Sequence, residues 1–137
     1  MVVQRSNRIE TFGFGVPWEE SHGYSQVFRI GDELRIAGQM PHDELGNLIL
    51  QNDPVAQVDA VFKNMDRVLA AFGARRNQII ENSIYAVDLE RTFPPISAAH
   101  REYFGDHRPV SSVFGVAALA VPGQLVEITA TARLDLR

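Results

Sequence analysis

The sequence predicts an α+β fold, an α/β sandwich in which a mixed sheet carries two α-helices on one face. Apolar residues recur at helical spacing between positions 54 and 72, which predicts an amphipathic helix. From Val126 to Leu136 they occupy every second position instead, which predicts a strand with one apolar face. Along the chain, the predicted order is strands, helix, strand, helix and two strands.

The composition is that of an ordinary globular protein. The 137 residues, 45% of them apolar and 22% charged, are expected to form one domain, residues 1–137. The net charge of −4 argues against nucleic acid or an anionic membrane as a partner, and the lack of cysteine excludes disulfides and thiolate chemistry. Because we find no signal peptide and no apolar run near the ~20 residues of a membrane helix, we expect a cytoplasmic protein.

Six segments are expected to be strands. Residues 1–13 form either a loose arm or, from position 9, a short first strand. The other five strands are expected over residues 24–30, 33–39, 79–89, 110–119 and 126–136. Gly31-Asp32 suits a two-residue hairpin turn, and Pro122-Gly123 suits a turn that makes the last two strands a hairpin or near-hairpin. Residues 110–119 are apolar on both faces, which is typical of a central buried strand.

Two helices are expected between these strands. Asp53 caps the first, Pro54 occupies its first position and Gly73 follows its end. Its predicted buried stripe consists of Val55, Val58, Val61, Phe62, Met65, Val68, Leu69 and Phe72. The second helix is expected over residues 92–104, with its two prolines in the first turn, whereas residues 13–18 are expected to be irregular loop.

The sheet face that the helices leave uncovered carries Glu127, Thr129, Thr131 and part of the 110–119 strand. A wide sheet face with apolar spots and no helix over it is usually buried against another copy of the chain. We therefore predict a closed homo-oligomer with clefts where its subunits meet.

Common enzyme motifs are absent, since the sequence contains no GxGxxG, P-loop, HExxH or serine nucleophile elbow. No metal site is expected, because His42, Asp43 and Glu44 are adjacent in a turn and favour a solvated loop. His22 stays a candidate because it lies in a glycine-containing loop. A carboxylate within a buried strand must be paired, hydrogen-bonded or protonated, so Glu127 is either a structural ion-pair partner or a functional group.

Four short segments occur in an order and at spacings that are specific when taken together. They are Gly23-Tyr24-Ser25-Gln26, Ala37-Gly38-Gln39-Met40-Pro41, Gly105-Asp106-His107-Arg108-Pro109 and Val126-Glu127-Ile128. With these segments the chain resembles the RidA/YjgF family, also called the reactive-intermediate deaminases or L-PSP endoribonuclease-like proteins. The resemblance extends from about Trp18 to Arg133.

The resemblance implies the fold first described in bacterial chorismate mutase, with a mixed six-stranded sheet and two helices on one face. It also implies a homotrimer whose sheets pack inward as a barrel, with three clefts between the subunits. Members of the family are expected to hydrolyse reactive enamines and imines to keto acids and ammonia. Neither a metal nor an organic cofactor is implied.

The same resemblance assigns one catalytic position and several ligand-binding positions. Glu127 matches the glutamate that orients the attacking water, Tyr24 the tyrosine that lines the cleft, and Gly38 the glycine whose backbone borders the ligand. The other ligand-binding candidates are Ala37, Gln39, Ser97, Ser111, Ser112 and Val113.

Two positions depart from the family pattern. Ser111 stands where the family has the arginine that grips the substrate carboxylate, and Ala37 stands where it has a serine. A neutral hydroxyl cannot replace a bidentate, charge-assisted pair whose hydrogen bonds contribute about 1.5–3 kcal/mol each. We therefore expect inefficient turnover of small 2-imino acids and a ligand that is larger, less acidic or uncharged. Arg35 either supplies the missing charge or is a surface arginine, and Trp18 either lines a larger site or packs in an interface.

Three functions follow as hypotheses. The first is a Rid-type enzyme in which Glu127 positions water, while the Ser111 hydroxyl and backbone N–H groups around Ser112 and Val113 stabilise the developing charge. The second is a non-catalytic trimer that binds a small metabolite in the same cleft, which the loss of the arginine favours. The third, RNA cleavage, rests on the older family name and is disfavoured by the net charge of −4.

Overall fold

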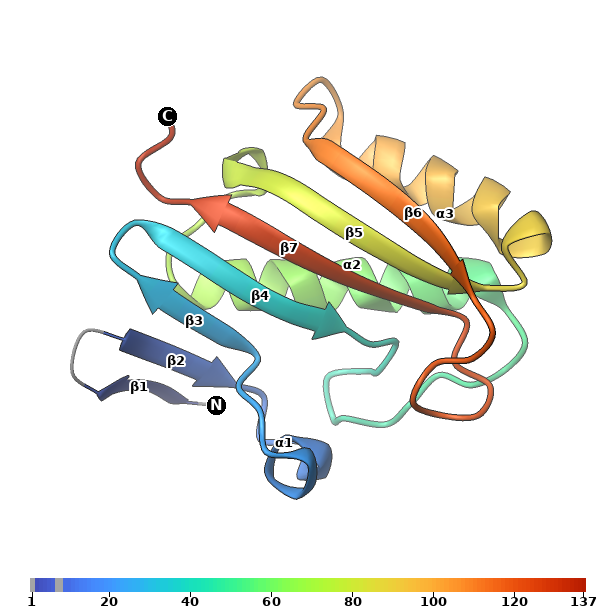
Figure 1. The fold of residues 1–137 in the computed structure, drawn as a ribbon, viewed down its shortest axis with the longest axis horizontal. Coiled ribbons are helices and arrows are strands. Elements are labelled where there is room, and N and C mark those ends of the chain that lie inside the picture. Colours follow the sequence, from blue (N-terminus) through green and yellow to red (C-terminus); the bar gives the residue numbers. More distant parts are fainter. Residues whose placement is uncertain (1, 7–8) are drawn as a thin grey trace.

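The structure, a computed structural model, describes residues 2–6 and 9–137, and the side chains of residues 9–137. Seven strands form one sheet in the order β1-β2-β3-β4-β7-β5-β6 (Figure 1). The strands are β1 Val2–Ser6, β2 Ile9–Gly13, β3 Val27–Ile30, β4 Glu33–Gln39, β5 Ile79–Val87, β6 Val110–Val116 and β7 Val126–Arg133. The helices are α1 Pro17–His22, α2 Pro54–Ala71 and α3 Leu89–Phe104, together with the short 3₁₀ helix η1 Arg76–Gln78.

The sheet is mixed, as predicted. All neighbouring strands in it are antiparallel except β5 and β6, which are parallel. Parallel neighbours need a crossover connection, and α3 provides it between β5 and β6. The six predicted strands are present, and β1 extends the sheet at one edge. Of the predicted arm or first strand over residues 1–13, positions 1 and 7–8 lie outside the described residues.

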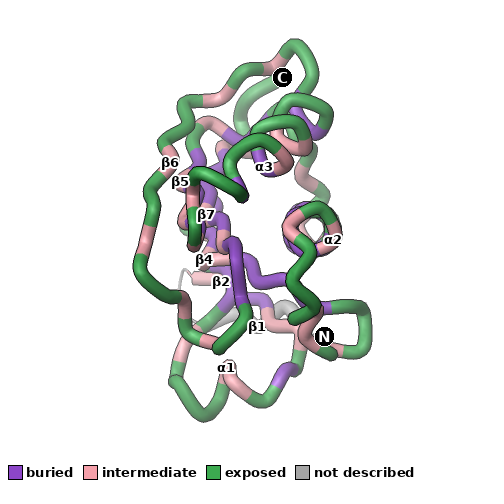
Figure 2. The backbone as a smooth tube through the Cα atoms, turned by 90° about the vertical axis from the view of Figure 1, so that its right-hand side faces the viewer, coloured by how far each residue is buried: buried purple, intermediate pink, exposed green. Residues whose placement is uncertain are grey.

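Both long helices pack on one face of the sheet, which confirms the predicted two-layer architecture (Figure 2). The central strand β7 shows why one face is preferred. Its alternate residues Val126, Ile128, Ala130 and Ala132 are buried beneath the helices, whereas Glu127 and Thr129 project from the other face. No helix in the described part of the chain has the length and apolar character needed to cross a membrane.

The predicted ends of α2 are confirmed. The Asp53 carboxylate accepts a hydrogen bond from the Ala56 N–H at 3.1 Å, and Gly73 follows the helix with a φ of +65°. The predicted stripe was wrong at Val55, which is 62% exposed. Gln57 is buried instead. Its side-chain amide donates to the Gly123 carbonyl at 2.9 Å, and its Oε1 accepts the Leu125 N–H at 2.8 Å.

The prediction for residues 110–119 was wrong in two respects. Strand β6 is an edge strand rather than a central one, because β5 lies between it and β7; the last two strands therefore form no hairpin. Its apolar residues have different surroundings on the two faces: Val113 packs against the core, whereas Val110 and Phe114 are 70% and 47% exposed on the uncovered face. The helices cover only one face of this edge strand, so the apolar side chains on its other face are left without a covering layer in the described part of the chain.

Three local predictions were also wrong. The predicted loop over residues 13–18 contains the start of α1, which has Pro17 at its first position and is too short for a periodicity argument. Strand β3 begins at Val27 because the chain leaves α1 through Gly23, whose φ is +85°. Helix α3 begins at Leu89, which puts its prolines in the second turn. The Thr92 hydroxyl instead bonds the Val87 carbonyl at 3.0 Å near the helix start.

Candidate functional site

The candidate site is built on a β-bulge in β4. The register with β7 pairs Ile36 with Ala130 and then Gln39 with Ile128, so β4 holds one extra residue there. Because of this extra residue, Ala37 and Gly38 both lie on the face that the helices leave uncovered. Bulges of this kind often occur next to functional sites, where they redirect a side chain.

The Glu127 side chain lies directly against the main chain of this bulge. A Cβ atom added to Gly38 would lie only 2.5 Å from Cδ of Glu127 and 2.7 Å from its Oε2. Gly38 is therefore required by the close approach of a carboxylate and not by an unusual φ. No local motif links Gly38 to Glu127, which is far away in the sequence. Only the register between β4 and β7 shows why this glycine is needed.

The Glu127 carboxylate is partly buried on this face. Burial raises its pKa above the usual range, and a hydrogen bond with Gln124 opposes this shift only in part. Desolvation disfavours the charged form of an acid, so a proton is held more tightly here than on a surface glutamate. Such a group is suited to accept a proton from water and to return it.

Tyr24 is held beside Glu127 by a polar network that begins in α1. The Glu19 carboxylate accepts the N–H groups of Phe14 and Gly15 at 2.9 and 3.0 Å, and also the Gln26 side-chain amide at 2.9 Å. The same Gln26 amide donates to the Tyr24 hydroxyl at 3.1 Å. Burial, together with the neighbouring Glu19 and Glu127 carboxylates, raises the pKa of Tyr24, so its hydroxyl stays protonated and can donate a hydrogen bond.

Gln39 supports this network from the buried side of β4 and does not line the open face. Its Nε2 donates to Gln26 Oε1 and to the Ala37 carbonyl, both at 3.0 Å. Within residues 9–137 its Oε1 has no hydrogen-bond partner, and the same is true of Gln124 Oε1. Sequence reasoning missed Glu19, Gln26 and Gln124, because no motif marks these polar residues as partners of Tyr24 and Glu127.

Of the three residues left open by the sequence, Arg35 lies on the same open sheet face, and His22 and Trp18 lie beside Tyr24. Arg35 lies on the open face with Phe28 and Ala37, along a shallow hollow of about 310 Å³, and its guanidinium is 3.7 Å from the Glu33 carboxylate. The His22 ring contacts Tyr24 edge to face, with 5.6 Å between ring centroids. Trp18 packs beside Tyr24 against the ring of His42. The solvated loop predicted for His42 was wrong, because this aromatic contact leaves His42 only 3% exposed.

The remaining predicted positions lie elsewhere in the chain. Ser111 pairs with Asn82 on the helix-covered side of β6, where its hydroxyl donates to Asn82 Oδ1 at 2.6 Å. Ser112 is exposed on the open face and Val113 packs on the core, while Ser97 is exposed on α3. Within one chain, the structure thus brings together Glu127, Gly38, Ala37 and Tyr24 but not the β6 residues. No group of three histidine or acidic side chains among the described residues could hold a metal ion.

Comparison with known proteins identifies what this arrangement is similar to. Residues 17–134 match the family model described as "Endoribonuclease L-PSP". A RutC family protein of Pyrococcus horikoshii is 33% identical over 109 residues, which cover 80% of this chain and 85% of that protein. The crystal structure of a Mycobacterium tuberculosis member of the YjgF/YER057c/UK114 family has a TM-score of 0.79 and 31% identity, covering 90% of this chain and 97% of that one. RidA from the Antarctic bacterium Psychrobacter, 24% identical, shares the fold with a TM-score of 0.78, over 93% of this chain and 99% of that one.

We predict that Gly38→Ala destabilises the protein by about 1–3 kcal/mol, because the new methyl group occupies the space of the Glu127 carboxylate. Gly115→Ala is the control, since its Cβ would come no closer than 3.3 Å to its nearest neighbour, the Leu89 side chain. Urea unfolding at one protein concentration measures both. If the contact is the cause, Gly38→Ala with Glu127→Ala costs less than the sum of the single changes; additive costs contradict it.

We also predict that Glu127→Gln is more stable than the natural protein at pH 7 and that this difference shrinks toward pH 4. A raised pKa means that the folded state binds the proton more tightly than the unfolded state does. The stability contributed by Glu127 is therefore complete below the ordinary glutamate pKa of about 4.3 and is lost as the pH rises through the folded value. Urea unfolding at pH 4 and pH 7 tests this, with Glu44→Gln in the exposed loop as the control. A pH-independent difference would contradict it.

Proposed function

We propose that this chain, which belongs to the RidA/YjgF family of L-PSP endoribonuclease-like proteins, hydrolyses small enamine or imine compounds with release of ammonia. The observation that carries the proposal is the partly buried Glu127 carboxylate, held against the Gly38 backbone with its pKa raised and with Tyr24 beside it. These features suit a group that positions water and exchanges protons with it.

The proposed reaction adds water across a carbon–nitrogen double bond. Glu127 accepts one proton as the water oxygen forms its bond to the imine carbon, while the electron pair of the carbon–nitrogen double bond moves to the nitrogen, which takes up a proton from solvent. In the resulting amino alcohol, Glu127 returns its proton to the nitrogen, the carbon–nitrogen bond breaks to release ammonia, and the hydroxyl loses its proton to solvent as the carbonyl forms. Protons and electron pairs balance without an oxidant, so this chemistry requires no redox partner. The Tyr24 hydroxyl is suited to hold the substrate or the water by a neutral hydrogen bond.

The uncovered sheet face supports a homotrimer as the working form. Phe28, Ile30, Val110 and Phe114 are 40%, 50%, 70% and 47% exposed, and the strand register places all four on this face. The Phe114 ring stacks on Tyr85, which pairs with Glu127 across the sheet. Burial of this face between copies of a cytoplasmic trimer would bring the β6 edge of one chain toward another chain's Glu127, in a cleft that Ser111 to Val113 then help to form.

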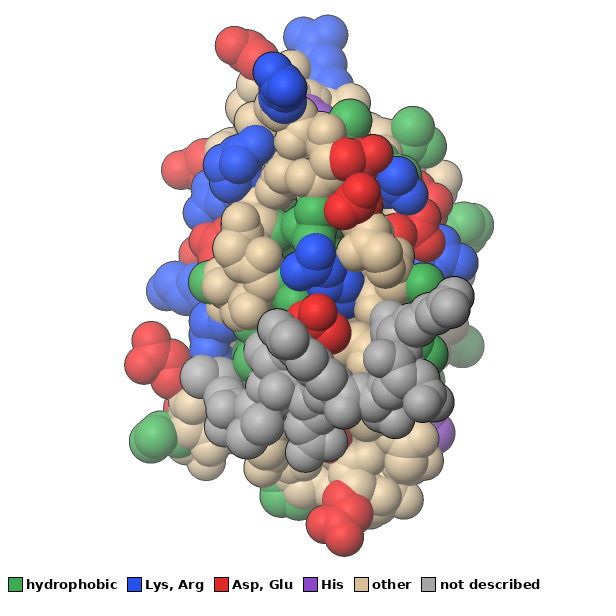
Figure 3. Space-filling model, turned by 90° about the vertical axis from the view of Figure 1, so that its left-hand side faces the viewer, with side chains coloured by type: hydrophobic (Ala, Val, Ile, Leu, Met, Phe, Trp, Pro, Cys, Tyr) green, Lys and Arg blue, Asp and Glu red, His purple; other side chains and the backbone are tan. Residues whose placement is uncertain are grey.

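A second function, ligand binding without turnover, is favoured by one observation. The Ser111 hydroxyl already donates to Asn82 at 2.6 Å, so the position where the family has its carboxylate-gripping arginine offers neither a charge nor a free donor. A cleft of this composition suits a small metabolite that is retained but not hydrolysed. RNA cleavage has less support, because the net charge is −4 and acidic and basic side chains are interspersed on the face drawn in Figure 3.

We expect Glu127→Gln to lower the rate of ammonia release from imines by about 10²- to 10⁴-fold, the usual contribution of a general acid–base group. The substrates are generated in place by an amino-acid oxidase acting on several amino acids, and ammonia is measured over the buffer rate. Glu44→Gln is the control and should keep the full rate. Ligand stabilisation in a thermal-shift screen without any acceleration would support the binding function instead.

We further expect sedimentation equilibrium to give a mass three times that of the 15.3 kDa chain. Phe114→Glu places a charge on the proposed interface and should shift the protein toward monomers. Leu45→Glu is the control, because Leu45 is 87% exposed in the 40–50 loop and not on the sheet. A monomeric natural protein would exclude the trimer.

A further inference from the structure

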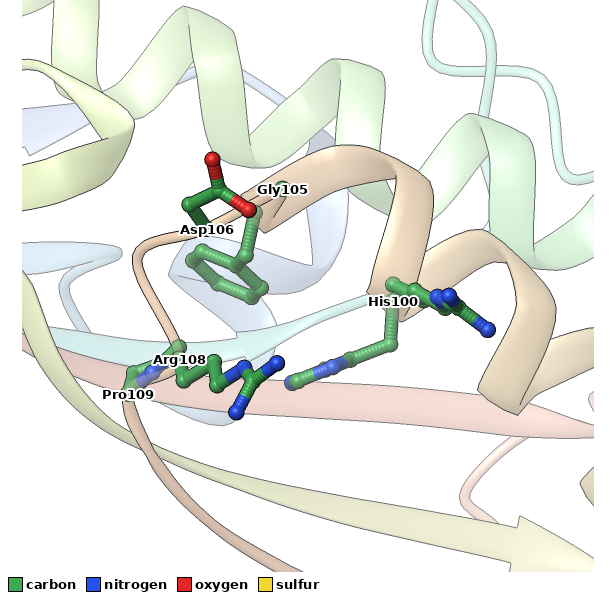
Figure 4. A pocket seen from close by; sticks show the side chains of 7 residues that line it. His100, Gly105, Asp106, Arg108 and Pro109 are labelled. Carbon is green, nitrogen blue, oxygen red and sulfur yellow. The ribbon is translucent and has the colours of Figure 1, made fainter.

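A cavity of about 380 Å³ opens at the C-terminal end of α3, away from Glu127 (Figure 4). Its volume lies within the range of small-molecule sites. Phe104 and Pro109 give it apolar walls, and the Phe104 ring is tilted against the His100 ring with 4.7 Å between centroids. Arg101 and Arg108 complete the lining with two positive charges.

The two guanidinium groups are available to a ligand. Within residues 9–137, neither Arg101 nor Arg108 takes part in an ion pair or a side-chain hydrogen bond. In contrast, Arg76, Arg91 and Arg133 each bind an aspartate at 2.7 to 2.9 Å. Figure 4 shows the Arg108 side chain extending toward the His100 ring, with the Asp106 carboxylate directed away from both.

His100 contributes a neutral donor, because a hydrogen-bonded chain fixes its tautomer. The Ser111 hydroxyl donates to Asn82 Oδ1 at 2.6 Å, which leaves the Asn82 amide group to donate to His100 Nε2 at 3.0 Å. An Nε2 that accepts a hydrogen bond carries no proton, so the proton of the neutral ring is on Nδ1. Burial lowers the pKa of His100, which keeps the ring neutral at pH 7.

We propose that this cavity binds a small monocarboxylate with an apolar body, that Arg108 holds the carboxylate group, and that Arg101 adds a second positive charge to the lining. A guanidinium can bind a carboxylate through two parallel hydrogen bonds, and the apolar walls exclude water from the ligand's body. The cavity is linked to Ser111, the position where the family arginine is missing, because His100 and Ser111 both hydrogen-bond Asn82. The proposal does not require Glu127 to be catalytic.

Two features of the cavity oppose the binding of an anion, but their effect is weaker than the attraction of the arginines. The last carbonyl groups of α3 give this end of the helix a partial negative charge, and Asp106 is a lining residue. The helix-end effect is screened and falls off within the last turn, whereas hydrogen bonds to a guanidinium are charge-assisted and act at contact distance. With two unpaired arginines against one acid, the cavity favours an anion.

The test is NMR titration with 3-methylbutanoate, and with 3-methylbutanamide as its uncharged isostere. We expect the natural protein to bind the carboxylate at least 10-fold more tightly than the amide, with shifts at His100, Phe104 and Pro109. Arg108→Ala should weaken carboxylate binding by about 10- to 100-fold, the equivalent of losing a charge-assisted hydrogen bond or pair. Arg108→Lys should fall between, because it keeps the charge and loses the planar fork.

Arg29→Ala is the matched control, since Arg29 is bonded to the Gly31 carbonyl near the β3–β4 turn and does not line the cavity. Glu127→Gln should bind the carboxylate like the natural protein while losing turnover, so a failure of the proposed enzyme function and a failure of this site give different results. Equal affinities for acid and amide, an unchanged affinity of Arg108→Ala, or shifts confined to Gly38 and Glu127 would overturn the proposal.

Discussion

The contact between the Glu127 carboxylate and the bare main chain of Gly38 is the constraint on which the site depends. It needs three things at once: a bulge that turns two successive β4 residues to one face, a glycine at the second of them, and a β7 register that sets Glu127 opposite Tyr85. If any of these is lost, the carboxylate must either swing into solvent or displace the strand. The raised pKa follows from the same contact, because a side chain lying on a strand surface is partly removed from water.

Much of the fold could be predicted because its signals are local. The Asp53 cap, the helical stripe of α2 and the alternation along β7 are each contained within a few turns or one strand. The predictions failed at positions whose environment is determined by segments distant in sequence. Residues 110–119 are apolar on both faces. No local rule distinguishes a central strand from an edge strand whose exposed apolar face can be covered by another molecule. Helix α1 is too short to show a period, and the role of Gln57 depends on the loop at 123–125.

The candidate site shows the same division. Glu127 stood out because an acid inside an apolar alternation is rare, and Tyr24 and Gly38 were found only through the family resemblance. The network that fixes Tyr24 was not visible, because Glu19, Gln26 and Gln39 are ordinary polar residues until the fold brings Gln26 within 2.9 Å of Glu19 and within 3.0 Å of Gln39. The cavity at the C-terminal end of α3 was equally hidden, since an exposed turn arginine carries no sign in the sequence that it lacks a partner.

The position of β7 has a consequence for how the chain acquires its structure. The last of the seven strands in sequence occupies the middle of the sheet, between β4 and β5. During synthesis the two flanking groups, β1 to β4 and β5 with β6, have no direct pairing with each other and stay separate until β7 emerges. The two halves of the sheet therefore join only when β7 pairs with both, and until that moment the edges of β4 and β5 are open to chaperones or to the wrong strand.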